Sequence, residues 1–136
     1  MGKSTPVSIR IITADIKRLV QFFEDVTATT AQWATDDFAE LVTNSFILAI
    51  GSTRTLAFFG EGVAQAATNK SVIIEFLVEN VDEDYERIQD LNCEIVQKPT
   101  TMPWGNRSLL FRDPDGNLIN LFTPVSDEAK TKFASR

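Results

Sequence analysis

The sequence predicts an α+β domain made of two βαβββ modules. The order of one strand, one helix and three strands occurs twice, over residues 7–60 and 72–125. The two copies superpose at an offset of about 65 residues, which aligns VSIRII with VIIEFL. A chain of 136 residues, 43% of them hydrophobic, suits a single domain. One helix covers only one face of a sheet, so the two modules are expected to form an open mixed β-barrel with a helix on the outside of each module.

The first module begins with a strand and a helix. Val7–Thr13 is rich in β-branched residues, and Asp15 is suited to cap a helix over Ile16–Asp25. The helix carries its apolar side chains on one side, so we expect it to cover a sheet. Turn residues then separate four short apolar runs, which predict strands at Gln32–Thr35, Ala39–Val42, Phe46–Ile50 and Thr55–Phe59. The first two of these runs are short enough to be parts of one bent strand.

A small and polar segment, residues 61–71, is predicted to link the modules. The second module opens with a strand at Val72–Val78, after which Asn80 or Asp82 can cap a helix that runs to Leu91. Three further strands are predicted at Glu94–Gln97, Arg107–Arg112 and Leu118–Thr123. Residues 126–136 form a polar C-terminal tail, either a disordered end or an arm packed on a neighbouring chain.

The composition excludes several classes of function. Thirteen basic and nineteen acidic residues give a net charge of −6, which disfavours nucleic-acid and anionic membrane partners. The chain has no histidine, so it cannot contain a Ser-His-Asp triad, a Cys-His pair or a histidine-rich metal site. The single Cys93 cannot form a disulfide within the chain, and we interpret it as a small buried apolar residue. No segment is typical of a signal peptide or a membrane span, and a cytoplasmic location is expected.

A turn motif near the C-terminus carries the clearest signature. Asp113-Pro114-Asp115-Gly116 combines a fixed φ, an acceptor side chain and a residue tolerant of positive φ, which predicts a tight hairpin turn and not a pair of catalytic carboxylates. The whole segment PWGNRSLLFRDPDGNLINL, residues 103–121, resembles the signature of the glyoxalase/bleomycin-resistance/dioxygenase superfamily, whose members are also called vicinal oxygen chelate proteins. The junction at residues 78–85 is similar too. The resemblance implies the same two-module fold.

The resemblance also implies a metal centre, because enzymes of that family chelate a divalent ion with a His or Gln on the first strand and a Glu on the last strand of each module. Matching the motifs position by position places Ser8, Ala57, Ile73 and Asn120 where those ligands would stand. One hydroxyl and one amide cannot replace the anionic oxygens and imidazoles that such an ion requires. We therefore predict no metal and no cofactor, which puts the family's metal-dependent activities in doubt.

Strand alternation predicts which side chains face a groove between the modules. Ser8 and Arg10 share one strand face, and Ile73 and Glu75 share the equivalent face in the second module. Arg10 and Glu75 either form a partly buried salt bridge or orient a polar or zwitterionic ligand. Aromatic side chains are expected around them, some in the groove and some in the core. The full predicted ligand pocket is Ser8, Arg10, Trp33, Phe38, Phe46, Ala57, Ile73, Glu75, Trp104, Phe111, Asn120 and Phe122.

Three functional hypotheses follow from the residues and the resemblance. The leading one is a metal-free small-molecule binding protein, similar to the bleomycin-resistance branch, that sequesters an aromatic and cationic compound such as an antibiotic. The second is a glyoxalase-like lyase or dioxygenase-type enzyme with a relocated or absent metal, in which Glu75 acts as a general base. The third is a structural or regulatory module whose groove is filled by side chains. A homodimer is expected, because the family commonly completes its cavities by pairing chains.

Overall fold

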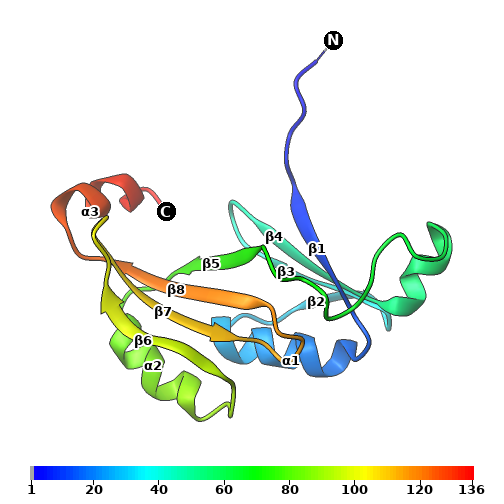
Figure 1. Ribbon diagram of the computed structural model, residues 1–136. Coiled ribbons are helices and arrows are strands. Elements are labelled where there is room, and N and C mark those ends of the chain that lie inside the picture. Colours follow the sequence, from blue (N-terminus) through cyan, green and yellow to red (C-terminus); the bar gives the residue numbers. More distant parts are fainter. Residues whose placement is uncertain (1) are drawn as a thin grey trace. The chain divides into compact units, whose positions relative to one another are not determined.

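Two four-stranded mixed sheets, each with a helix on one face, make up the computed structural model, which describes residues 2–136 (Figure 1). The predicted α+β fold with two βαβββ modules is confirmed. The chain divides into two compact units, with the boundary between Thr68 and Asn69. Each module is described by itself below.

The first module pairs its first strand with its last. Its elements are β1 (Ser8–Thr13), α1 (Ile16–Thr27), β2 (Gln32–Thr35), β3 (Phe38–Val42) and β4 (Ile47–Ser52). The strand order is β1-β4-β3-β2, in which β1 and β4 are parallel and the other pairs are antiparallel. The suggestion that 32–35 and 39–42 form one bent strand is wrong, because Asp36 and Asp37 lie in a turn and the two strands pair with each other.

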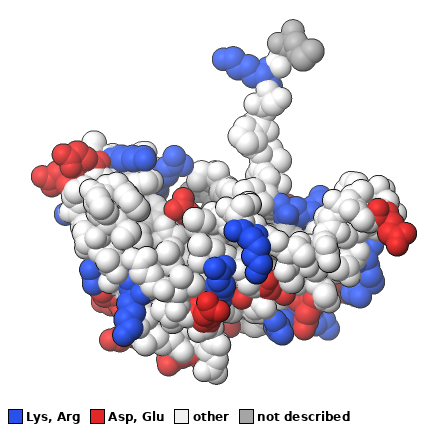
Figure 2. Space-filling model, viewed as in Figure 1, with Lys and Arg blue, Asp and Glu red and all other residues white. Residues whose placement is uncertain are grey.

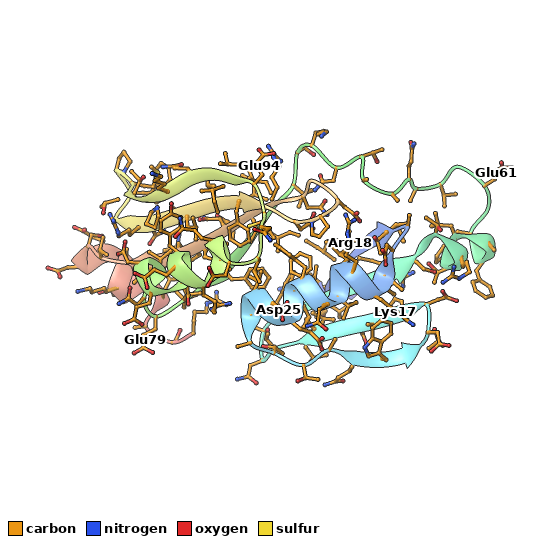
Figure 3. The ribbon with its side chains drawn as sticks, turned by 90° about the horizontal axis from the view of Figure 1, so that it is seen from below. Lys17, Arg18, Asp25, Glu61, Glu79 and Glu94 are labelled. Carbon is orange, nitrogen blue, oxygen red and sulfur yellow. The ribbon has the colours of Figure 1, made fainter. Side chains whose placement is uncertain are left out.

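Helix α1 covers one face of this sheet. The side chain of Asp15 accepts a hydrogen bond from the backbone N–H of Arg18 at 3.2 Å, which caps the helix start as predicted. Its buried apolar side chains pack against β3 and β4; they are Ile16, Leu19, Val20, Phe22, Phe23 and Val26. Lys17, Arg18 and Asp25 of α1 are exposed (Figure 3). Burial of this apolar face is the main stabilising contribution of the helix.

The strand predicted at Thr55–Phe59 is wrong. Residues 53–58 form a 3₁₀ helix, η1 (Thr53–Phe58), and β4 extends two residues further than predicted, to Ser52. Ser52 caps η1 by accepting from the backbone N–H of Arg54, and Asp37 accepts from both the Ser52 hydroxyl at 2.8 Å and the Arg54 guanidinium at 2.7 Å. These polar contacts turn the chain away from the sheet and outweigh the apolar pattern that suggested a strand.

The second module repeats this topology. Its elements are β5 (Ile73–Leu77), α2 (Val81–Gln89), β6 (Ile95–Thr101), β7 (Asn106–Arg112) and β8 (Leu118–Pro124). The order is β5-β8-β7-β6, and β5 and β8 are parallel. Helix α2 packs on β6, β7 and β8 and buries Val81 and Ile88. Leu109, Phe111 and Ile119 form the fully buried core of this module.

The C-terminal tail forms a helix that packs on the second module, so the alternative of a disordered end is wrong. Residues Asp127–Phe133 form helix α3, which Ser126 caps by accepting from the backbone N–H of Ala129 at 3.1 Å. The Phe133 ring meets the Phe122 ring of β8 edge to face, with 5.0 Å between centroids. Phe122 lies on the sheet face opposite α2, so α3 and α2 lie on opposite faces of this sheet (Figure 1).

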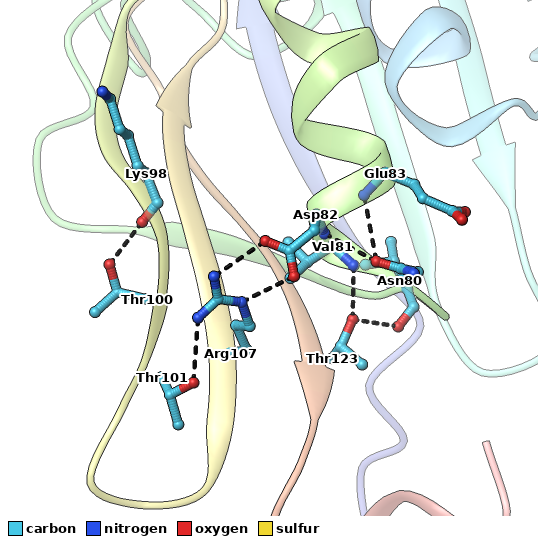
Figure 4. Close-up of polar contacts among 10 residues, drawn as sticks. Asn80, Val81, Asp82, Glu83, Lys98, Thr100, Thr101, Arg107 and Thr123 are labelled. Carbon is cyan, nitrogen blue, oxygen red and sulfur yellow. Dashed lines mark hydrogen bonds and ion pairs between the residues drawn. The ribbon is translucent and has the colours of Figure 1, made fainter.

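Polar contacts anchor the start of α2 to the sheet (Figure 4). Asn80 accepts from the backbone N–H groups of Asp82 and Glu83, and Asp82 forms a two-point ion pair with Arg107 of β7 at 2.9 and 3.0 Å. The Thr123 hydroxyl accepts from the backbone N–H of Val81 and donates to the carbonyl of Val78, both at 3.0 Å. These contacts fix the angle at which the chain leaves β5 and enters α2.

Replacing Thr123 with valine should lower the free energy of unfolding by about 2 kcal/mol. The volume is kept, but the Val81 N–H and the Val78 carbonyl both lose their partner. Chemical denaturation of the two proteins measures the difference. Thr100→Val is the control, because its hydroxyl only donates to the nearby Lys98 carbonyl on an exposed strand. Equal stability of the wild type and the Thr123 variant would contradict the anchoring role.

Candidate functional site

The Asp113 turn joins β7 to β8, and its two ends, Asp113 and Asn117, are buried. The Asp113 carboxylate, 5% exposed, accepts from the backbone N–H groups of Asp115 and Asn117, both at 2.9 Å, and from the Asn117 side-chain amide at 2.7 Å. Burial raises the pKa of Asp113, and the hydrogen bonds from Asn117 and Asp115 oppose that rise. All three donors lie in the turn itself, so this carboxylate is structural.

Gly105 connects the β6–β7 turn to helix α3. It has φ +95, and its carbonyl accepts from the backbone N–H groups of Val125 and Ser126 at 2.8 and 3.1 Å. A Cβ at this position would overlap the Ser126 side chain and lie 3.3 Å from the Ala129 Cβ. The neighbouring Trp104 is 66% exposed. Absence of a side chain at residue 105 is what lets α3 begin against the sheet.

The sheet face opposite α2 carries the most distinctive polar pair. Glu75 of β5 and Asn120 of β8 are direct register partners, so their side chains lie on the same face. The Asn120 amide donates to the Glu75 carboxylate at 2.8 Å. Asn120 is 9% exposed and its Oδ1 is buried without a hydrogen-bond partner among the described residues. Glu75 is exposed.

Apolar side chains flank this pair on the same face. Ile73 and Leu77 of β5 are 49% and 38% exposed, and Phe122 of β8 is buried beneath α3. A hollow of about 440 Å³ opens at the end of the face that Leu77 and Phe133 line. Its remaining wall residues are Val78, Glu79, Thr123, Pro124, Lys130 and Arg136. Polar acceptors next to exposed apolar surface are the elements of a small-molecule site.

Arg10 occupies the equivalent place in the first module. It is the register partner of Ala49 on the face opposite α1, and its guanidinium carbon lies 4.9 Å from the Phe38 ring centroid and 5.7 Å from that of Phe59. Arg10 is therefore held by cation–π contacts inside its own module.

The other predicted pocket residues separate into two groups. In the first module, Ser8 and Phe38 lie on the same sheet face as Arg10. In the second module, the residues on the same sheet face as Glu75 are Ile73, Asn120 and Phe122. By contrast, Trp33 pairs with Ala39 on the α1 side, and Phe111 pairs with Ile119 in the core under α2. Phe46, 37% exposed, precedes β4 in a turn, and Trp104 lies in the β6–β7 turn.

Ala57 does not lie on a strand, which corrects the expected equivalence with Asn120. The last strand of the first module is β4, and its residue opposite Arg10 is Ala49, just as Asn120 lies opposite Glu75. Phe59, Ala49 and helix α3 were missed by the sequence reasoning. The cap residue Ser126, followed by acidic and then basic residues, was a usable signal for α3. No sequence signal distinguished Phe59 from the other exposed aromatics.

The comparisons with known proteins agree with this geometry. The family model described as "Glyoxalase/Bleomycin resistance protein/Dioxygenase superfamily" matches residues 5–121. The chain belongs to this superfamily. It is 26% identical over 122 residues to the uncharacterized protein YraH of Bacillus subtilis (strain 168), a match covering 85% of this chain and 95% of that protein.

Solved structures of the glyoxalase/bleomycin resistance protein/dioxygenase superfamily share the fold at low identity. A glyoxalase/bleomycin resistance protein/dioxygenase from Nocardioides has a TM-score of 0.74 at 20% identity, with 93% of this chain and 87% of that chain covered. A family enzyme from Burkholderia phytofirmans PsJN has a TM-score of 0.77 at 14% identity, with 87% and 97% covered. At such identities the similarity establishes the fold, and any chemical activity has to be argued from the residues of the site.

The metal centre associated with the superfamily does not fit the residues of this chain. With Ala49 in place of Ala57, the positions that match the family's metal ligands are Ser8 and Ala49 in the first module and Ile73 and Asn120 in the second. These side chains offer one hydroxyl and one amide oxygen, with no carboxylate and no imidazole among them. Among residues 2–136, no three His, Cys, Asp or Glu side chains gather where they could hold a metal ion. This donor set cannot repay the dehydration of a divalent cation.

The remaining chemical features are structural. Cys93 is partly buried, its sulfur lies 3.7 Å from the Ile88 carbonyl, and burial raises the pKa of its thiol, which disfavours the nucleophilic thiolate. Basic and acidic side chains are interspersed over the face shown in Figure 2. In the described part of the chain, no helix has both the length and the apolarity needed to cross a membrane.

Proposed function

We propose that this chain is a small-molecule binding protein that works without the superfamily's metal ion. The observation that carries the proposal is the replacement of the expected metal-ligand carboxylate by Asn120, whose amide is bonded to Glu75 at 2.8 Å. The pair lies on a sheet face with exposed Ile73 and Leu77, so polar anchoring groups and apolar contact area occur together. The ligand site lies on this face.

Sequestration is the form of binding that we propose. The protein would hold an aromatic compound, such as an antibiotic, in a stoichiometric complex and release it unchanged, acting as a cytoplasmic homodimer. In the first module, the contacts of the Arg10 guanidinium with the Phe38 and Phe59 rings support aromatic recognition on the face opposite α1. Binding of this kind needs no general base and no activated nucleophile.

Metal and ligand titrations of the purified protein test the proposal. Metal analysis should find less than stoichiometric Ni, Co, Mn and Zn, and adding these ions should leave the melting temperature unchanged. A panel of aromatic compounds should contain ligands that raise the melting temperature saturably, with NMR shift changes on β5 and β8 and no product formed. One tightly bound divalent ion per chain would contradict the proposal. Turnover that disappears in Glu75→Gln would instead support the enzyme hypothesis.

A further inference from the structure

Asn120 is held in one orientation by its neighbour. Its amide nitrogen donates to the Glu75 carboxylate, an acceptor-only group, so the amide cannot flip without placing two acceptors against each other. The Oδ1 atom is left buried and without a partner among the described residues. Asn120 as a whole is only 9% exposed. A native structure rarely leaves such an acceptor unpaired unless something else binds it.

Glu75 adds a negative charge at the same point. Its carboxylate is exposed, and no cation of its own module pairs with it among the described residues. Register pairing places the Glu75 and Asn120 side chains next to each other on one face. The pair therefore presents two acceptor groups, one of them charged, and its only donor, the Asn120 amide nitrogen, is already used.

A cationic N–H group is the chemical partner that satisfies both acceptors. Its charge is attracted by Glu75, and one of its N–H groups can donate to Asn120 Oδ1. A carboxylate is repelled by Glu75, and a neutral hydroxyl leaves the charge uncompensated. Leu77 lies two residues beyond Glu75 on the same face and lines the hollow of about 440 Å³, which offers apolar surface for the body of such a molecule.

We infer that Glu75 and Asn120 form the recognition site for an organic cation that carries N–H donors, such as an ammonium or amidinium group on an apolar body. The inference rests on the proposed function and specifies its ligand class. The wall of the hollow carries two cations, Lys130 and Arg136, and one anion, Glu79, so it repels a second cation. The charged group of the ligand is therefore placed at Glu75 and not in the hollow.

The experiment compares three isosteric probes by calorimetry and by NMR shift mapping: benzamidine, benzamide and benzoate. Benzamidine should bind at least about tenfold more tightly than benzamide, and benzoate should not bind. Shift changes should centre on Glu75 and Asn120. Comparable affinities for all three probes, no binding of benzamidine, or shifts confined to another surface would overturn the inference.

Variants separate the role of charge from that of folding. Glu75→Gln and Asn120→Ala should each weaken benzamidine binding by roughly tenfold, and the melting curves should remain cooperative. Glu86→Gln removes the same charge from an exposed position on α2 and should bind benzamidine like the wild type. Unchanged affinity in Glu75→Gln would refute the inference. If neutral aromatics bind saturably while benzamidine does not, the proposed function stands and this inference fails; if no probe or panel compound binds, the proposed function fails as well.

Discussion

Replacing Gly105 with alanine should lower the free energy of unfolding by roughly 3–5 kcal/mol. The residue has φ +95, a backbone conformation that disfavours any side chain. A Cβ would also overlap Ser126, whose backbone N–H donates to the Gly105 carbonyl at 3.1 Å. Relieving that overlap requires α3 to move from β8, and urea denaturation followed by circular dichroism measures the loss.

Gly116→Ala is the matched control for Gly105→Ala. Gly116 has a similar φ of +86, but a Cβ there would meet nothing within 4 Å. The control therefore carries the conformational cost alone, roughly 1–2 kcal/mol. The difference between the two variants measures the contact with the start of α3. Two equal losses of stability would show that α3 does not depend on the close approach at Gly105.

Replacing Asp113 with alanine should lower the free energy of unfolding by about 3 kcal/mol. Its carboxylate accepts three hydrogen bonds, and the variant leaves the part-buried donor of Asp115 and the two buried donors of Asn117 unpaired. Asp115→Ala in the same turn is the control, because the Asp115 Oδ2 has no partner to lose among the described residues. Denaturation midpoints of the two variants that coincide would contradict the structural role of Asp113.

The same carboxylate gives a signed pH dependence. Burial raises the pKa of Asp113 above its ordinary value of 3.8. Between that value and the folded-state pKa, the folded protein binds more protons at this site than the unfolded chain does. The contribution of Asp113 to the free energy of unfolding therefore falls as the pH rises through this window. The stability difference between wild type and Asp113→Asn should shrink over the same window and become constant above it.

The sequence predicted those parts of the fold that depend on local patterns. Asp15 was predicted as a helix cap and Asn80 was one of two candidates beside Asp82, because such side chains accept from N–H groups two or three residues away. The turn at Asp113 was predicted for the same reason, since its donors all lie within four residues. The module order followed from these elements, and the superfamily followed from the resemblance of residues 103–121 to its signature.

Contacts between distant residues account for the errors. Residues 53–58 form η1 because Asp37, far back in the chain, holds Ser52 and Arg54. Without that partner, the run Leu56-Ala57-Phe58-Phe59 has the composition of a strand, and Ala57 was accordingly matched to Asn120. The pairing of Asn120 with Glu75 spans 45 residues and no local pattern encodes it.

The parallel pairing of each module's first and last strands has a consequence for how the protein is made. Residue 8 pairs with residue 47, and residue 73 pairs with residue 118. During synthesis, the first strand of each module therefore stays unpaired until the last strand of that module has been made. All strands of the first module precede residue 53, so its sheet can close while the second is still being translated. The protein is thus expected to fold in two successive steps, and during each wait the unpaired apolar strand is the segment that chaperones would protect.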